Sequence, residues 1–479
     1  QLPDQFWSPQ TNHRRDRYGG VLENRLRFSL DVLEAIRSAV GRDFIVGARV
    51  SGDDQLPGGL SPEELLEIIQ RLDRTEQLDY FTVTGGTIST FRSRGWNIPS
   101  AYYGLGTFVS LAGRIRSTVN TPVIVTGRIV TPDQAEQVLQ SGAADLVGMT
   151  RALIADPDLP TKARNQQPEQ IRVCMGSNEG CIDRLYFGLP IGCVQNPVVG
   201  REQSWGNLTP ATKPRHIVVI GGGPAGMETA RVAASRQHQV TLVERDNKLG
   251  GAIQIVARAA GWESYLQCVT WLKNQLQDLE VDIRLETDAT TNLIRSLSPD
   301  AVVVATGAEP RRPNLAGANL PHVVTVSDIL SGSASPSGRC VILDETGYTP
   351  GTKTADTLSQ LGYDVEIVTR QYALGEDIGT TVRAVLLERL LRTGVMITTL
   401  HTPVEITTSG VRLMHVLTDE ERFIEADTVV LSSSGIGRDA LHRELAEGNN
   451  YELHLVGDAF APRHLRHAMV DGARTGRAL

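Results

Sequence analysis

The sequence predicts an α/β protein with three parts: the C-terminal half of a TIM (β/α)8 barrel, an iron–sulfur loop, and two tandem Rossmann-like nucleotide-binding modules. Three observations support this prediction. Helix-like and strand-like segments alternate over residues 21–160, three of the five cysteines fall within residues 174–193, and a strand–turn–helix–strand plan occurs twice after residue 215. Such alternation is typical of parallel sheets covered by helices.

The barrel half rests on four βα units. Apolar periodicity predicts helices over residues 23–40, 65–72 and 131–141, and strands over residues 44–50, 80–84, 122–126 and 145–149. Ser61 begins a Ser-x-x-Glu capping box before the second helix. We expect strands buried on both faces, as in parallel sheets. Four units are too few for a closed eight-stranded barrel, so we expect four further units upstream of Gln1.

The predicted domain boundaries follow changes in composition. The barrel half covers residues 1–165, and a cysteine-rich segment with a polar linker covers residues 166–214. The first nucleotide-binding module covers residues 215–335 plus 426–479, and residues 336–425 form an inserted second module.

Charge and cysteine usage limit the function classes. The net charge is −8 at pH 7, which argues against a nucleic-acid surface. No apolar run approaches the roughly 18 residues of a membrane span. Cys268 and Cys340 stand alone, which argues against a disulfide framework and predicts a reducing cytoplasm.

The remaining cysteines suggest a metal centre. Cys174, Cys181 and Cys193 lie in a loop rich in glycine, asparagine and proline, where several sulfurs can reach one soft metal or cluster. A cysteine at Ser177 would complete the spacing C-x2-C-x3-C-x11-C of a four-ligand iron–sulfur site. The cluster could therefore be serine-ligated, three-iron or absent, and Ser177 is the uncertain ligand.

The first module contains a dinucleotide-binding pattern. Gly221, Gly223 and Gly226 form G-x-G-x-x-G between a strand and a helix, where backbone N–H groups can approach a diphosphate. Glu244 ends the next strand and is placed to bind a ribose hydroxyl. Gly251 and Asp458 belong to two further glycine-containing turns, and the ordered set predicts FAD or ADP.

The second module departs from this pattern at its turn. Asp344 and Thr346 stand where the first module has Gly221 and Gly223. A carboxylate repels a diphosphate, so we expect this module not to bind NAD(P)H in the usual way.

Strand ends in the barrel half predict a phosphate site. Gly127 and Arg128 end one strand, and Gly148 and Arg151 end the next, a combination suited to FMN. Arg49 lies inside an apolar strand, where burial is costly unless the guanidinium meets an anion or an electron-rich ring edge.

The start of the chain resembles the old yellow enzyme family of FMN barrels. The resemblance rests on Asn12-x-Arg14-x-Asp16-x-Tyr18-Gly19-Gly20 followed by Glu23-Asn24-Arg25-x-Arg27-Phe28. A barrel followed by a cysteine loop and a pyridine-nucleotide-reductase-like part is similar to the branch of 2,4-dienoyl-CoA reductase and trimethylamine and dimethylamine dehydrogenases. The similarity covers essentially the whole chain.

The resemblance implies roles for these residues. Arg49 would contact the flavin pyrimidine edge, and the glycines and arginines at the two strand ends would hold the FMN phosphate. The three cysteines would ligate a [4Fe-4S] cluster, and the first module would hold FAD or ADP. The catalytic residue is unknown, because the family's active-site histidine would precede Gln1. Leu185 replaces an aromatic residue of the trimethylamine-binding site.

These features predict a cytoplasmic oxidoreductase in which FMN oxidises an N-methylated amine or amino acid. Electrons would pass through the cluster, with an electron-transfer flavoprotein as the expected acceptor and a homo-oligomer as the expected full-length assembly. The enzyme alternative is an NAD(P)H-dependent 2-enoate or 2,4-dienoyl-CoA-type reductase. The non-enzyme alternative is a flavin-free nucleotide-binding fragment. Neither nucleic acid nor membrane is an expected partner.

Overall fold

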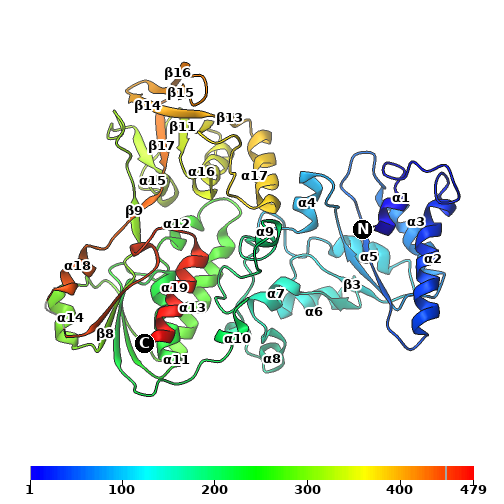
Figure 1. The fold of residues 1–479 in the computed structure, drawn as a ribbon, viewed down its shortest axis with the longest axis horizontal. Helices are drawn as coiled ribbons and strands as arrows, with labels where there is room; N and C mark the ends of the chain where they lie inside the picture. Colours follow the sequence, from blue (N-terminus) through cyan, green and yellow to red (C-terminus); the bar gives the residue numbers. More distant parts are fainter. Residues whose placement is uncertain (1, 448–449) are drawn as a thin grey trace. The chain divides into compact units, whose positions relative to one another are not determined.

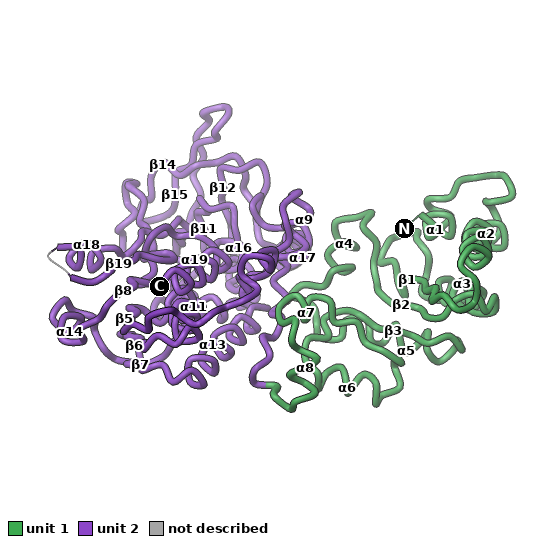
Figure 2. Tube along the Cα trace, turned by 60° about the horizontal axis from the view of Figure 1, so that its bottom comes forward, with its two compact units in different colours: residues 1–168 green, residues 169–479 purple. Residues whose placement is uncertain are grey.

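The structure is a computed structural model that describes residues 2–447 and 450–479. The chain forms two compact units, residues 1–168 and residues 169–479, coloured separately in Figure 2. Each unit has its own sheets and hydrophobic core. None of the described helices has the length and apolar character needed to cross a bilayer.

The first unit is built on a parallel four-stranded sheet (Figure 1). Its strands, in spatial order, are β1 (Gly47–Ser51), β2 (Tyr80–Thr84), β3 (Val123–Val125) and β4 (Leu146–Val147). The helices between and around them are α1 (Leu2–Trp7), α2 (Leu22–Val40), α3 (Pro62–Asp73), α4 (Phe91–Asn97), α5 (Val109–Arg116), α6 (Pro132–Gln140), α7 (Thr150–Ala155) and α8 (Leu159–Arg164). All seven predicted elements are present, and the predicted capping box at Ser61 is formed with Glu64.

The burial predicted for this sheet is only partly correct. Phe81 and Val83 of β2 and Val123 of β3 are fully buried, because helices and neighbouring strands cover the central strands. In contrast, Gly47 and Arg49 of β1 and Leu146 of β4 are exposed. The prediction of strands buried on both faces is therefore wrong for β1 and β4, which form the two edges of the sheet.

The first nucleotide-binding module contains a parallel five-stranded sheet. Its spatial order is β19 (Glu452–Leu455), β8 (Ala301–Val304), β5 (His216–Ile220), β6 (Gln239–Val243) and β7 (Asp282–Arg284). The helices of this module are α11 (Pro224–Ser235), α12 (Ile253–Val256), α13 (Leu266–Asp278), α14 (Thr291–Leu297), α18 (Ala440–Ala446) and α19 (Leu465–Ala478), with short turns η2 (Glu263–Tyr265) and η3 (Gly457–Ala459). The predicted strand–turn–helix–strand plan is confirmed as β5, α11 and β6.

The second module has a parallel sheet of the same kind. Its spatial order is β10 (Val323–Thr325), β17 (Thr428–Ser432), β11 (Arg339–Asp344), β12 (Asp364–Thr369) and β13 (Met396–Thr398). Helices α15 (Val326–Ser331), α16 (Thr349–Gln360) and α17 (Thr380–Arg392) accompany it. Strands β10 and β17 lie outside the range 336–425 expected for this module, although β17 pairs with β11 and β10 pairs with β17 to complete the sheet.

Smaller sheets complete this unit. An antiparallel sheet of β14 (His401–Thr407), β15 (Gly410–His415) and β16 (Glu421–Glu425) extends from the second module, as Figure 1 shows. Two short antiparallel strands, β9 (Ala308–Pro310) and β18 (Gly435–Gly437), pair where the chain passes between the two modules. The cysteine segment contains α9 (Ile182–Tyr186), and the predicted linker contains α10 (Glu202–Trp205).

Candidate functional site: nucleotide turns, strand ends and a cysteine loop

The glycine turn of the first module has two kinds of glycine. Gly221 has φ +106°, and a Cβ there or at Gly226 would collide with backbone carbonyl oxygens. These two glycines are needed for tight packing of the turn against the sheet and helix. A Cβ at Gly223, in contrast, would meet no protein atom within 4 Å. The space in front of Gly223, at the N-terminus of α11, therefore suits a diphosphate.

The other predicted nucleotide residues surround this turn. Oε2 of Glu244 accepts a hydrogen bond from the backbone N–H of Gly222 at 2.6 Å, and Glu244 is buried. Gly251 lies against Gly223, since a Cβ at Gly251 would be 3.2 Å from the Gly223 Cα. The turn with Asp458 is close as well, because a Cβ on Gly457 would lie 2.6 Å from the Ala225 Cβ. The structure thus brings the predicted residues together around one turn, and the chemistry of these residues fits an adenine nucleotide.

The second module fills the corresponding turn with protein. Oδ1 of Asp344 accepts hydrogen bonds from the backbone N–H of Thr346 at 3.1 Å, from the Thr346 hydroxyl at 2.7 Å and from the Ser432 hydroxyl at 3.0 Å. Asp344 is 3% exposed, and burial raises the pKa of its carboxyl group. The backbone N–H of Thr346 therefore has a side-chain acceptor, and a buried carboxyl group stands at the turn where the first module has a glycine.

The strand ends of the first unit bring two arginines to one loop. Arg128 Nη1 donates to the carbonyl oxygen of Ala101 at 3.2 Å and also to that of Tyr103, and Arg151 Nη1 donates to Pro99 at 2.8 Å. Both arginines follow adjacent parallel strands, β3 and β4. Two guanidinium groups at the carboxyl edge of a parallel sheet fit a phosphate in chemistry and position.

The glycines at these strand ends shape the turns. Gly127 has φ +104°, and a Cβ there would collide with the Phe108 ring. A Cβ on Gly148 would come within 2.7 Å of Thr126 Cγ2. Both glycines therefore allow close approach of the backbone, as predicted, although the neighbours they accommodate here are protein side chains.

Arg49 differs from its prediction. Its side chain was expected to be buried, but the residue is exposed on the edge strand β1, where no strand covers it. Its Nη2 donates to the Thr84 hydroxyl at 3.3 Å across the β1–β2 pair. The expected contact of Arg49 with a flavin remains a prediction.

Asp54, a buried carboxyl group close to the end of β1, was missed by the sequence analysis. Burial raises the pKa of Asp54 to about 6, and the carboxylates of Asp4 and Asp53 add to the shift, while a hydrogen bond from Ser51 opposes it. Only the adjacent pair of aspartates could have signalled this group from sequence.

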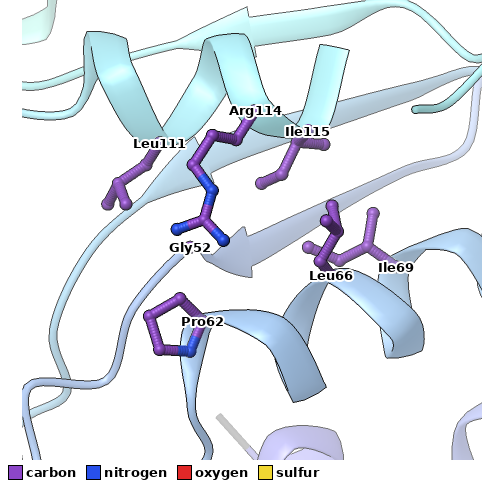
Figure 3. Close-up of a pocket in the computed structure, with 7 residues that line it drawn as sticks. All are labelled: Gly52, Pro62, Leu66, Ile69, Leu111, Arg114 and Ile115. Carbon is purple, nitrogen blue, oxygen red and sulfur yellow. The ribbon is translucent and has the colours of Figure 1, made fainter. Parts of the chain in front are cut away.

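The first unit also contains two hollows, and neither collects the predicted site residues. A cavity of about 10 Å³ beneath Gly52 holds at most one water molecule (Figure 3). It is lined by Gly52, Pro62, Leu66, Ile69, Leu111, Arg114 and Ile115. A hollow of about 500 Å³ lies beside the first turn of α6, near Gly106 and Gln134.

The cysteine loop is assembled only in part. Cys174 lies close enough to Cys193 for an electrostatic interaction, and the Cys193 sulfur accepts hydrogen bonds from the backbone N–H groups of Gln195 and Asn196. Burial raises the pKa of the Cys193 thiol, the nearby Cys174 adds to the shift, and Arg172 opposes it. N–H···S bonds and a nearby cation suit a metal-bound thiolate in chemistry.

The other two predicted ligands, Cys181 and Ser177, have surroundings of their own. The Cys181 thiol donates to the carbonyl oxygen of Asn178 at 3.6 Å, and Ser177 is buried. Within residues 2–447 and 450–479, no three His, Cys, Asp or Glu side chains are grouped as metal ligands. The donor set therefore fits a cluster in chemistry but not in its present arrangement.

A cluster of titratable and aromatic side chains in and beside this loop also went unpredicted. The Glu179 carboxylate is bonded by the Tyr348 hydroxyl and lies 3.1 Å from Nδ1 of His464, whose ring stacks on Tyr348 at 3.9 Å. Lys353 is 3% exposed and lies over the Trp262 ring. No sequence signal marked Lys353, because the polar composition of α16 suggests a surface helix.

Comparison with known proteins identifies the family. Residues 1–170 match the NADH:flavin oxidoreductase / NADH oxidase family, and residues 215–454 match the pyridine nucleotide-disulphide oxidoreductases. An NADH oxidase from Thermoanaerobacter brockii is 34% identical over 465 residues, covering 96% of this chain and 70% of that protein. This chain belongs to the NADH:flavin oxidoreductase / NADH oxidase family. The two matches indicate FMN in the barrel part and a FAD- or NAD-type nucleotide in the second part.

Two further similarities involve enzymes that act on amines. The chain is 41% identical over 389 residues to an N,N-dimethylglycine/sarcosine dehydrogenase from Chromohalobacter salexigens, covering 79% of this chain and 56% of that protein. A solved histamine dehydrogenase from Rhizobium sp. 4-9 has TM-score 0.92 and 28% identity, covering all of this chain and 72% of the other. The matched region thus spans little more than half the length of the dimethylglycine/sarcosine dehydrogenase.

Proposed function

We propose that the protein is an FMN-dependent dehydrogenase that oxidises an N-methylated amine or amino acid. FMN, when bound, supplies the hydride acceptor. The similarity to the N,N-dimethylglycine/sarcosine dehydrogenase and to the histamine dehydrogenase supports an amine substrate. The phosphate of FMN would be held by Arg128 and Arg151 at the ends of β3 and β4.

One observation favours this direction over an NAD(P)H-dependent reductase. In the second module Asp344 already accepts the backbone N–H of Thr346, and its carboxyl group stands at the turn where a dinucleotide's diphosphate would bind. Placing a diphosphate there would bring negative charge against a buried carboxyl group. On this proposal the second module presents no nicotinamide to the flavin, and the reducing equivalents come from the amine substrate.

The first module would bind the adenine nucleotide. The open space at Gly223 would take the diphosphate, and the Glu244 carboxylate would turn to a ribose hydroxyl. We leave FAD and ADP as the two candidate ligands, because both present the same ADP group to this turn.

The cysteine loop is proposed as the site of an iron–sulfur cluster. Cys174, Cys181 and Cys193 would hold it, with Ser177 as the uncertain fourth ligand, and the cluster when bound supplies one-electron transfer. An electron-transfer flavoprotein is the proposed acceptor, and a cytoplasmic homo-oligomer is the proposed setting. Cys268 and Cys340 are free and buried, which agrees with a reducing compartment.

The second candidate function is a 2-enoate or 2,4-dienoyl-CoA-type reductase driven by NAD(P)H. The similarity to an NADH oxidase favours it. The two functions differ in which compound reduces the flavin.

The test is anaerobic flavin reduction in the intact holoenzyme. We expect N,N-dimethylglycine, sarcosine or a related N-methylated amine to bleach the flavin within seconds to minutes, and NADH and NADPH to leave it oxidised. Rapid bleaching by either nicotinamide, with no response to any N-methylated amine, would replace this proposal with the reductase.

A further inference from the structure

We propose that the second nucleotide-fold module is a clamp that positions the cysteine loop, residues 174–193. The contact is made by Thr381 in the first turn of α17 and by Tyr348 at the start of α16. This inference deepens the proposed function, on which it rests for the role of the loop in electron transfer. It assigns a task to a module whose phosphate turn is filled by Asp344.

Thr381 holds two side chains of the loop at once. Its hydroxyl donates to Oδ1 of Asp183 at 2.8 Å and accepts from Nδ2 of Asn178 at 3.0 Å. All three residues are at most 2% exposed. Breaking such buried hydrogen bonds would leave polar groups with neither a protein partner nor water to bond to, which is costly. This arrangement therefore strongly favours one position of the loop.

Asp183 of the cysteine loop also caps helix α17 of the second module. The backbone N–H of Thr381 donates to Asp183 Oδ1 at 3.3 Å, and the α17 N-cap residue, Gly379, has no side chain to do this. A Cβ on Gly379 would collide with the Asp183 carboxyl group, so the glycine makes room for it. A carboxylate at a helix N-terminus satisfies an unpaired N–H and interacts favourably with the helix dipole.

Glu179 makes a second contact between the cysteine loop and the second module. Its carboxylate is bonded by the Tyr348 hydroxyl of the second module and by His464, which precedes α19 of the first module. The loop around residues 171–180 has no helix or strand of its own. These side-chain contacts therefore help to set its position, and hence that of Cys174 and Cys181. Two further hydrogen bonds also hold the segment: the Ser264 hydroxyl donates to the Met175 carbonyl oxygen at 2.9 Å, and Nε2 of Gln195 donates to that of Val173 at 2.6 Å.

The experiment compares two matched variants of the intact protein. Thr381→Val removes the hydroxyl with little change in shape. Thr354→Val is the control, because Thr354 is also fully buried in this module, but its hydroxyl donates to Pro350 of its own helix at 2.9 Å. The readout is peptide-resolved amide hydrogen exchange over residues 176–189.

We expect exchange in the loop to be faster by roughly tenfold in Thr381→Val and unchanged in Thr354→Val. Peptides from β11 and β12 should keep wild-type exchange in both variants. Equal loop exchange in the two variants would overturn the clamp.

A double-mutant cycle tests whether Thr381 and Asp183 act on the loop through their shared hydrogen bond. Asp183→Ala should accelerate loop exchange, and adding Thr381→Val should then add less than its effect in the wild type, because the hydrogen bond with Asp183 is already lost and only the one with Asn178 remains to be broken. Fully additive effects of the two substitutions would contradict a direct clamp. The FMN content and amine oxidation of each variant, measured in parallel, report on the proposed function separately. If the wild-type protein does not oxidise amines, the proposed function is wrong, but the hydrogen-exchange comparison still decides whether Thr381 positions the loop.

Discussion

The side-chain amine of Lys353 lies over the face of the Trp262 indole ring, joining α16 of the second module to the first module. The ring of Tyr265 is also near, at 5.3 Å from the amine. Burial lowers the pKa of Lys353 well below its usual value, and the negative charge of Glu179 only partly opposes this. Cation–π contact offsets some of the cost of burying the amine, but desolvation is the larger effect.

Replacing Lys353 with methionine should therefore stabilise the protein near neutral pH. Methionine fills a similar volume without a charge to desolvate, so we expect the free energy of unfolding to rise by about 1 kcal/mol or more. Urea unfolding, followed by tryptophan fluorescence, measures it. Lys273→Met on the exposed side of α13 is the control and should change little.

The difference in stability between the wild type and Lys353→Met should depend on pH. The folded-state pKa of Lys353 is below the unfolded-state value, so the unfolded chain binds the extra proton between these two pKa values. Stability therefore rises with pH across that window in the wild type but not in Lys353→Met. The advantage of the variant should shrink between pH 7 and about pH 10. A constant difference across this range would contradict the assignment.

Gly223→Val should abolish binding of the adenine nucleotide while the fold persists. The backbone of Gly223 has φ −76°, which valine tolerates, and the added side chain meets only the space intended for the diphosphate. Nucleotide released from the denatured variant should fall by at least about tenfold, with FMN content and far-ultraviolet circular dichroism unchanged. Full retention of FAD or ADP would show that this turn is not the site.

A neighbouring glycine supplies the contrast. Gly226→Ala places a Cβ against the carbonyl oxygen of Gly221, so its effect should be on stability. We expect a loss of about 1–3 kcal/mol in the free energy of unfolding. The two substitutions thus separate a ligand-facing glycine from a packing glycine in one motif.

Most of the fold could be predicted because local patterns and long-range packing agree. The strand over residues 80–84 and the capping box at Ser61 appear as predicted, since apolar alternation and side-chain capping act over a few residues. The glycine turn of the first module could also be placed, because a strand, a G-x-G-x-x-G turn and a helix specify one another.

The errors arise where burial depends on the position of an element in the whole fold. The apolar strand around Arg49 suggested a buried guanidinium, but β1 is a sheet edge and the residue is exposed. Conversely, α16 looks polar, yet nine of its twelve residues are buried, including Lys353 and Asp356. Asp356 pairs with Arg389 at 3.1 Å, a partner 33 residues away that no local pattern reveals.

The open edges of the first sheet predict poor flavin binding by this 479-residue chain on its own. Strands β1 and β4 each have one neighbour, and Phe44 and Ile45 near β1 are 61% and 71% exposed. Uncovered edges and apolar side chains favour association. Size-exclusion chromatography with light scattering should show aggregates, and visible absorbance should show less than stoichiometric FMN. Monodisperse protein with one FMN per chain would contradict this prediction.

Ser177→Cys should increase iron retention by the intact protein. A serine alkoxide is a harder and more basic ligand than a thiolate, so it binds iron of a cluster less well. Anaerobically purified wild type should contain about three or four iron atoms per chain, lost quickly in air, and the variant should lose iron several-fold more slowly. Iron analysis and low-temperature electron paramagnetic resonance measure this. Cys340→Ser, at a buried cysteine of the second module outside the cysteine loop, is the control and should leave iron retention unchanged. Absence of iron from both the wild type and Ser177→Cys would contradict the proposed cluster and the one-electron route. The positioning of the loop by Thr381 would still be tested by hydrogen exchange.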